Sequence, residues 1–192
     1  MELVFATANQ NKVNEVQKLV GQKFKLLSLK DINCTEEIPE TGDTFKGNAL
    51  QKAKYIFDKF KLNCFADDSG LEVEVLNGAP GVYSARFAGE PKNDSNNTKK
   101  LLNELSGKTN RKACFKTAIA LIIDGKEEYF EGKIDGHITQ DPIGNDGFGY
   151  DPVFMPDGYQ KTFAQMSLDE KNSISHRAIA IQKLVRFLSA KA

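Results

Sequence analysis

Residues 3–20 read LVFATANQNKVNEVQKLV, a short apolar run that leads through a polar loop into a helical repeat. The run Leu3–Ala6 stops at polar residues, which predicts a buried strand. Apolar residues then recur at the spacing of one helix face, at Val13, Val16, Leu19 and Val20. A strand that passes through a loop into a helix is the building unit of an α/β fold.

Later segments add a second type of strand connection. A long helix is predicted to begin near Thr44, and Cys64–Ala66 is a short apolar strand that ends at Asp67. Residues 113–123 form the most apolar run of the chain, and the Asp124-Gly125 pair after them is typical of a tight hairpin turn. Because a hairpin pairs antiparallel strands, we expect an α/β fold with a mixed sheet.

Local patterns predict several shorter elements. Alternating apolar residues at 71–75 indicate a half-exposed strand, and Ser167 with Glu170 forms a capping-box pattern. We also expect strands at 24–29, 127–131 and 151–154, and helices that begin at an Asp94-Ser95 cap and near Ser175.

Composition and charge limit the function classes. The chain has 192 residues, with 26 basic and 26 acidic side chains and a net charge of zero. This balance argues against a binder of nucleic-acid polymers and against a basic membrane-surface protein, because both need a surplus of Lys and Arg. The length predicts a single domain over residues 1–192. The first residues lack a signal-peptide pattern, and three scattered cysteines suit reduced thiols in the cytoplasm.

Two candidate binding segments precede predicted helices. The first comprises Thr7, Ala8, Asn9, Gln10, Asn11 and Lys12. Free N–H groups at a helix start and the charge of Lys12 suit an anion, although a polar cap by Asn9 or Asn11 explains the segment equally well. The second segment begins at Glu40. A cap by Thr41 or Thr44 accounts for much of it, and Lys52 lies two turns into the same helix.

The third candidate, Asp67-Asp68-Ser69-Gly70, follows an apolar strand. Ligands of α/β proteins bind at the carboxyl ends of strands. Adjacent strand residues point to opposite faces, so the two aspartates are expected to do different work. One of them could hold Mg²⁺ or orient a water molecule, and the alternative is a turn in which they cap backbone groups.

Two further candidates lie towards the end of the chain. Glycines around Phe148 permit close approach of a ligand, and the ring offers a stacking surface for a base. An ordinary glycine-rich loop is the alternative there. Next, His176 and Arg177 follow the expected helix start at Ser175, where cations are unfavourable without an anionic or carbonyl-rich ligand.

Taken together, these segments make the chain resemble the inosine triphosphate pyrophosphatase family, to which dITP/XTP pyrophosphatases belong. Members hydrolyse nonstandard purine nucleoside triphosphates to the monophosphate and pyrophosphate. The resemblance rests on motifs starting at Thr7, Glu40, Ala66, Gly78, Gly147 and Ser175, quoted in order: TxNxxK, ETGxTFxxNA, ADDSGL, GAPGVYSAR, GFGYDP and SHR. The chain departs from the family at Ala8, where glycine is usual, and at Asn145-Asp146.

The resemblance implies a fold, a site and partners. It implies an elongated mixed β-sheet flanked by helices, with two lobes around a central cleft, in a cytoplasmic homodimer. It also implies that Glu40 and Asp68 hold Mg²⁺ and that Asp68 is the general base for water attacking the α-phosphorus. The substrate-binding residues it implies are Thr7, Ala8, Asn9, Gln10, Asn11, Lys12 and Lys52 for the triphosphate, Ser69, and Phe148, Gly149, Tyr150, Asp151, Lys171, His176 and Arg177 for the base.

Hydrogen-bond chemistry gives the implied base pocket a physical rationale. Hypoxanthine and xanthine present a 6-keto acceptor, whereas adenine presents a 6-amino donor. Lys171 and Arg177 can only donate, so they would pair with the keto group and face adenine donor to donor.

Two other functions fit parts of this pattern. A pyrophosphatase of the Maf-like group would act on modified pyrimidine nucleotides, but the motifs at Gly147 and Ser175 argue against it. A nucleotide-binding sensor without hydrolysis would have no need of both a metal site and a base, which Glu40 and Asp68 would supply.

Overall fold

The structure is a computed structural model that describes residues 2–21 and 24–191. The chain forms two compact units. The first unit comprises Met1–Asp68, Thr117–Gly132 and Arg177–Ala192, and the second comprises Ser69–Lys116 and Lys133–His176.

The described strands form one six-stranded sheet in the order β2-β1-β3-β4-β5-β6. Their bounds are β1 Glu2–Phe5, β2 Lys25–Leu27, β3 Cys64–Val73, β4 Lys112–Ile123, β5 Lys126–Ile138 and β6 Phe154–Pro156. Strand β1 is parallel to both β2 and β3, whereas β5 and β6 are antiparallel. The predicted mixed sheet is confirmed.

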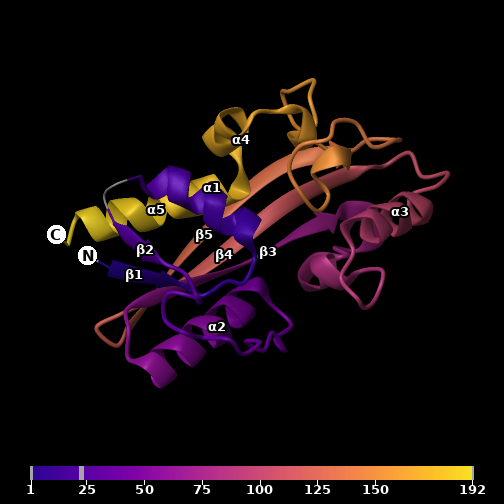
Figure 1. Ribbon diagram of the computed structural model, residues 1–192. Helices are drawn as coiled ribbons and strands as arrows, with labels where there is room; N and C mark the ends of the chain where they lie inside the picture. Colours follow the sequence, from indigo (N-terminus) through magenta and orange to yellow (C-terminus); the bar gives the residue numbers. More distant parts are fainter. Residues whose placement is uncertain (1, 22–23, 192) are drawn as a thin grey trace. The chain divides into compact units, whose positions relative to one another are not determined.

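In the first unit, helices cover both faces of the sheet (Figure 1). Helices α1 (Gln10–Val20) and α5 (His176–Ser189) pack on one face, and α2 (Phe45–Phe60) packs on the other. Successive strand residues point to opposite faces, so Phe5 and Phe65 join the α1/α5 core while Ala6 and Ala66 join the α2 core. This alternation sets the directions of the side chains that follow Ala66.

Strand β3 is longer than the sequence predicted. It does not end at Ala66 but continues through Asp67 and Asp68 to Val73. Acidic residues are unfavourable in strands unless partners satisfy them, and partners from distant segments do so here, as described below. The expected half-exposed strand at 71–75 is also wrong, because Leu71 and Val73 are fully buried and a 3₁₀ turn follows at Glu74–Leu76.

The second unit is built around a core that includes Phe115, Phe154 and Phe163. Helix α3 (Asp94–Glu104) and helix α4 (Leu168–Ile174) belong to it. The capping box of Ser167 and Glu170 is confirmed, as is the cap of α2 by Thr44 in the first unit.

Three boundary predictions need correction. The cap of α3 is Asn93, one residue before the predicted pair. The expected strand at 151–154 begins as a 3₁₀ turn, Asp151–Val153, because Pro152 has no N–H for a strand ladder. Strand β5 extends well beyond residues 127–131, after a turn in which both Asp124 and Gly125 have positive φ.

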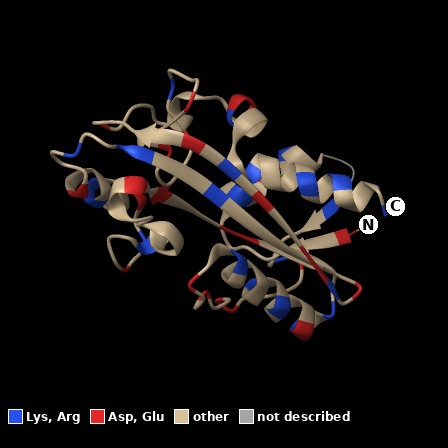
Figure 2. Ribbon diagram, turned by 180° about the vertical axis from the view of Figure 1, so that it is seen from behind, with Lys and Arg blue, Asp and Glu red and all other residues tan. Residues whose placement is uncertain are grey.

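Charges of both signs are interspersed over the ribbon (Figure 2). None of the helices in the described parts of the chain is long and apolar enough to cross a membrane.

Candidate active site

The loop between β1 and α1 is arranged as a helix cap from which a lysine extends. The side chain of Asn9 caps α1 by accepting hydrogen bonds from the backbone N–H groups of Asn11 and Lys12. The hydroxyl of Thr7 accepts from the N–H of Asn9 at 3.2 Å. The cap therefore orders the loop, and the side chain of Lys12 reaches back to β3.

Asp67 is the centre of a buried charge network in the first unit. Its carboxylate accepts from Nζ of Lys12 at 3.0 Å and from Nε of Arg177 at 3.2 Å, and it is only 1% exposed. Arg177 also pairs through Nη1 with Glu15 of α1. Burial alone would raise the pKa of Asp67, but the surrounding cations hold that pKa well below its usual range. Asp67 is therefore a permanent anion that fixes two cations.

Asp68 points to the opposite face of β3 and has different partners. Its carboxylate accepts from the side-chain amide of Asn48 at 2.9 Å, and the amide oxygen of Asn48 accepts from the N–H of Gly42 at 2.7 Å. Burial raises the pKa of Asp68. The attraction of Lys52 and the bond from Asn48 oppose this rise, and the negative charge of Glu40 adds to it. Neighbouring carboxyl groups thus have pKa values shifted in opposite directions.

Lys52 links the Glu40 segment to β3. Its ammonium group is buried, pairs with Glu40, and donates to the backbone carbonyl of Asp67 at 2.7 Å. Thr44 begins α2, so Lys52 extends from its third turn towards both segments. The lysine that sequence reasoning could have taken for a solvated residue is therefore an internal cation.

The residues fit a magnesium ion that binds together with phosphate. Among the described residues, no group of three or more His, Cys, Asp or Glu side chains could hold a metal by itself. Glu40 and Asp68 are two hard oxygen donors, and they lie close enough for the charge of one to affect the pKa of the other. Mg²⁺ is commonly held by one or two carboxylates and by substrate phosphates.

A second group of predicted residues lies within the second unit, around Asp151. The buried carboxylate of Asp151 accepts from Nζ of Lys171 at 2.6 Å and from the N–H of Phe148 at 2.9 Å. The ammonium of Lys171 also lies 4.7 Å from the centroid of the Phe148 ring. A side chain at Gly147 would meet Oδ2 of Asp151 at 2.2 Å, so only glycine allows this approach.

Tyr150 and His176 are packed into the core of the second unit. The hydroxyl of Tyr150 donates to the carbonyl of Ser84 at 2.8 Å, and burial raises the pKa of this hydroxyl. The imidazole of His176 stacks on Phe115 with 4.6 Å between ring centroids. Ser69 is half-buried within β3. Of the predicted base-site residues, Phe148, Gly149, Tyr150, Asp151, Lys171 and His176 lie in the second unit, whereas Arg177 bonds within the first.

Comparison with known proteins assigns the chain to a family. The Ham1 family model matches residues 3–187. The chain belongs to the Ham1 family. It is 57% identical to a dITP/XTP pyrophosphatase of Flavobacterium psychrophilum over 97% of this chain and 98% of that protein.

Solved structures of Ham1 relatives have the same fold. The Staphylococcus aureus Ham1 protein has a TM-score of 0.91 and 39% identity, with complete coverage of both chains. A nucleoside-triphosphatase / dITP/XTP pyrophosphatase from Mycobacterium abscessus has a TM-score of 0.78 and 42% identity, covering 96% of this chain and 98% of its own.

Sequence reasoning left several supporting residues of this Ham1 chain without a role. Asp67 was noticed only as the neighbour of Asp68. Glu15 lies three residues after Lys12 on the same face of α1, a spacing that could have suggested a shared role. Asn48 lies inside the second motif, one turn into α2. Nothing in the local pattern pointed to Asp94 or Ser84.

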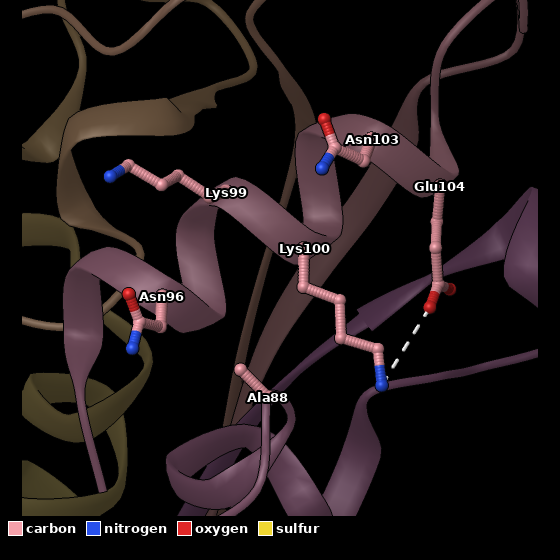
Figure 3. Close-up of a pocket in the computed structure, with 6 residues that line it drawn as sticks. All are labelled: Ala88, Asn96, Lys99, Lys100, Asn103 and Glu104. Carbon is pink, nitrogen blue, oxygen red and sulfur yellow. Dashed lines mark ion pairs between the residues drawn. The ribbon is translucent and has the colours of Figure 1, made fainter.

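A shallow surface hollow in the second unit lies apart from all of the predicted residues. It lies over α3 and is lined by Ala88, Asn96, Lys99, Lys100, Asn103 and Glu104 (Figure 3). Lys100 is engaged there, because its ammonium donates to the carbonyl of Phe87 and lies near Glu104. The hollow therefore does not enter the proposal below.

Proposed function

We propose that this chain hydrolyses nonstandard purine nucleoside triphosphates, namely ITP, dITP and XTP, to the monophosphate and pyrophosphate. The observation that carries the proposal is the opposite shift of the pKa values of Asp67 and Asp68. Neighbouring carboxyl groups with divergent pKa values are typical of sites where one group is a fixed charge and the other handles protons.

In this mechanism Asp68 accepts a proton from the water that attacks the α-phosphorus. Its raised pKa makes it a better base than an ordinary carboxylate. The bond between the α-phosphorus and the bridging oxygen breaks, and pyrophosphate leaves. Lys12 and Lys52 neutralise phosphate charge, since phosphoryl transfer depends on positioning and charge more than on covalent catalysis. Asn48 holds the carboxylate of Asp68 in place.

Glu40 and Asp68 would hold Mg²⁺ together with phosphate oxygens. A bound magnesium ion would supply neutralisation of negative charge on the triphosphate. The homodimer and the cytoplasmic location implied by the resemblance are also parts of this proposal, and light scattering of the purified protein tests the dimer.

One assay tests the reaction. The chain is incubated with ITP, XTP, ATP and dTTP in the presence of Mg²⁺, and pyrophosphate and orthophosphate are measured separately. We expect pyrophosphate from ITP and XTP. Orthophosphate as the first product would indicate cleavage at the γ-phosphate and would overturn the proposal, whereas preferential turnover of dTTP would favour a pyrimidine pyrophosphatase.

The Lys171→Ala substitution is expected to weaken discrimination between ITP and ATP. Lys171 can donate to a 6-keto oxygen but not accept from a 6-amino group. We expect the ratio of kcat/KM for ITP to that for ATP to fall by about 10-fold or more, the range that a lost hydrogen bond produces. Lys161→Ala, at an exposed lysine of the same unit, is the control. An unchanged ratio in Lys171→Ala would contradict the donor argument.

A further inference from the structure

Helix α3 holds the backbone of Gly149 at two points. The N–H of Gly149 donates to Oδ2 of Asp94 at 2.8 Å. The hydroxyl of Thr98 donates to the carbonyl of Gly149 at 3.4 Å. Asp94 and Thr98 are four residues apart and so share one face of the helix. Both polar groups of one loop residue are thereby tied to the start of α3.

The residues on either side of Gly149 are held by other parts of the unit. The N–H of Phe148 bonds to Asp151, and the hydroxyl of Tyr150 bonds to the carbonyl of Ser84. Gly149 itself has a φ of +61°, in the left-handed region, where the backbone gives no rigidity of its own. The peptide that follows the Phe148 ring therefore depends on α3 for its position.

We propose that Asp94 is a positioning residue for base recognition, acting through Gly149 on the orientation of the Phe148 ring. This rests on the proposed function, in which Phe148 stacks on the purine. Asp94 suits this role because, among the hydrogen bonds and ion pairs of the described residues, its carboxylate bonds to Gly149 alone. Asp151, in contrast, also holds Lys171, so a change there would disturb more than the loop.

The first test compares Asp94→Ala with Asp94→Asn. Alanine removes the acceptor for the N–H of Gly149, whereas asparagine keeps an acceptor oxygen. We expect Asp94→Ala to raise KM for ITP by about 3- to 10-fold with kcat within about twofold, the pattern of lost ground-state binding. Preference for ITP over ATP should fall with it, and Asp94→Asn should be close to the unchanged enzyme.

Inhibition by tripolyphosphate separates the base from the phosphates. Tripolyphosphate carries no base, so its inhibition constant should be the same in Asp94→Ala and in the unchanged enzyme. An equal loss of affinity for ITP and tripolyphosphate would show general damage and would overturn the proposal. An unchanged KM and an unchanged ITP/ATP ratio in Asp94→Ala would also overturn it.

A second variant controls for the stability of α3. Asp94 lies in the first turn, where a negative charge favours the helix. The double variant Asp94→Ala/Ser95→Asp restores a charge to that turn but not the bond to Gly149. We expect it to behave like Asp94→Ala. Recovery of the original KM would mean that helix stability is the cause, which would overturn the positioning role.

Amide hydrogen exchange gives a readout that does not depend on activity. In the free protein, Asp94→Ala should speed exchange of the Gly149 amide, and Asp94→Asn should not. If the unchanged protein fails to hydrolyse ITP, the proposed function fails while exchange still tests the anchor. If exchange at Gly149 is the same in all variants, Asp94 does not hold the loop and this inference fails by itself.

Discussion

Asp68→Asn is expected to lower kcat for ITP by about 10²- to 10⁴-fold, the range associated with loss of a general base. Asparagine has nearly the same shape and can still contact Asn48, but its amide cannot take a proton from water. Substrate should still bind, because Lys12 and Lys52 remain. Pyrophosphate release measures turnover, and calorimetry with ITP measures binding.

The matched control for this variant is Asp157→Asn, at an exposed turn of the second unit. It makes the same chemical change away from the predicted site and should leave kcat as it was. Near-normal turnover by Asp68→Asn would exclude Asp68 as the base. Loss of ITP binding in proportion to the loss of turnover would assign Asp68 to metal and substrate binding instead.

Asp67→Asn is expected to cause the largest loss of stability among these variants. It leaves Lys12 and Arg177 buried without the anion that joins them. Breaking a buried ion pair by removing one partner costs about 3–5 kcal/mol, which for a chain of this length corresponds to a fall in Tm of about 10 °C. Thermal and urea unfolding measure the loss, and Asp157→Asn again serves as the control.

The stabilisation by Asp67 should depend on pH in a defined direction. The pKa of Asp67 is lowered in the folded state, so its contribution is fully present above the unfolded pKa of about 3.9. It is lost as the pH falls from there through the folded pKa. The stability difference between the unchanged protein and Asp67→Asn should therefore be constant near neutral pH and shrink in strong acid. A difference that grew on acidification would contradict the assigned pKa shift.

The elements with strong local signals could be predicted from the sequence. The strand, loop and helix of residues 3–20, the Thr44 cap and the turn at Asp124-Gly125 are all set by neighbouring residues. Boundaries between equivalent signals were harder. Asn93, Asp94 and Ser95 are all good capping residues, and only the fold shows that the first of them caps α3.

The continuation of β3 through Asp67 could not be predicted in the same way. A buried aspartate in a strand is unfavourable by local propensity, and its partners Lys12 and Arg177 lie 55 and 110 positions away in the sequence. The sequence therefore indicated which residues carry charge, but not that these charges compensate one another inside the first unit. The roles of Asp67 and Glu15 follow only from that arrangement.

The division of the first unit into separate stretches of chain has a consequence for biosynthesis. Its core combines Leu3 and Phe5 with Leu184 and Leu188, and the whole of the second unit is encoded between them. During translation the second unit emerges in full before α5 has been made. The first strand of the protein must therefore wait for the last helix, and nascent chains released before α5 would expose an incomplete apolar face to chaperones and proteases.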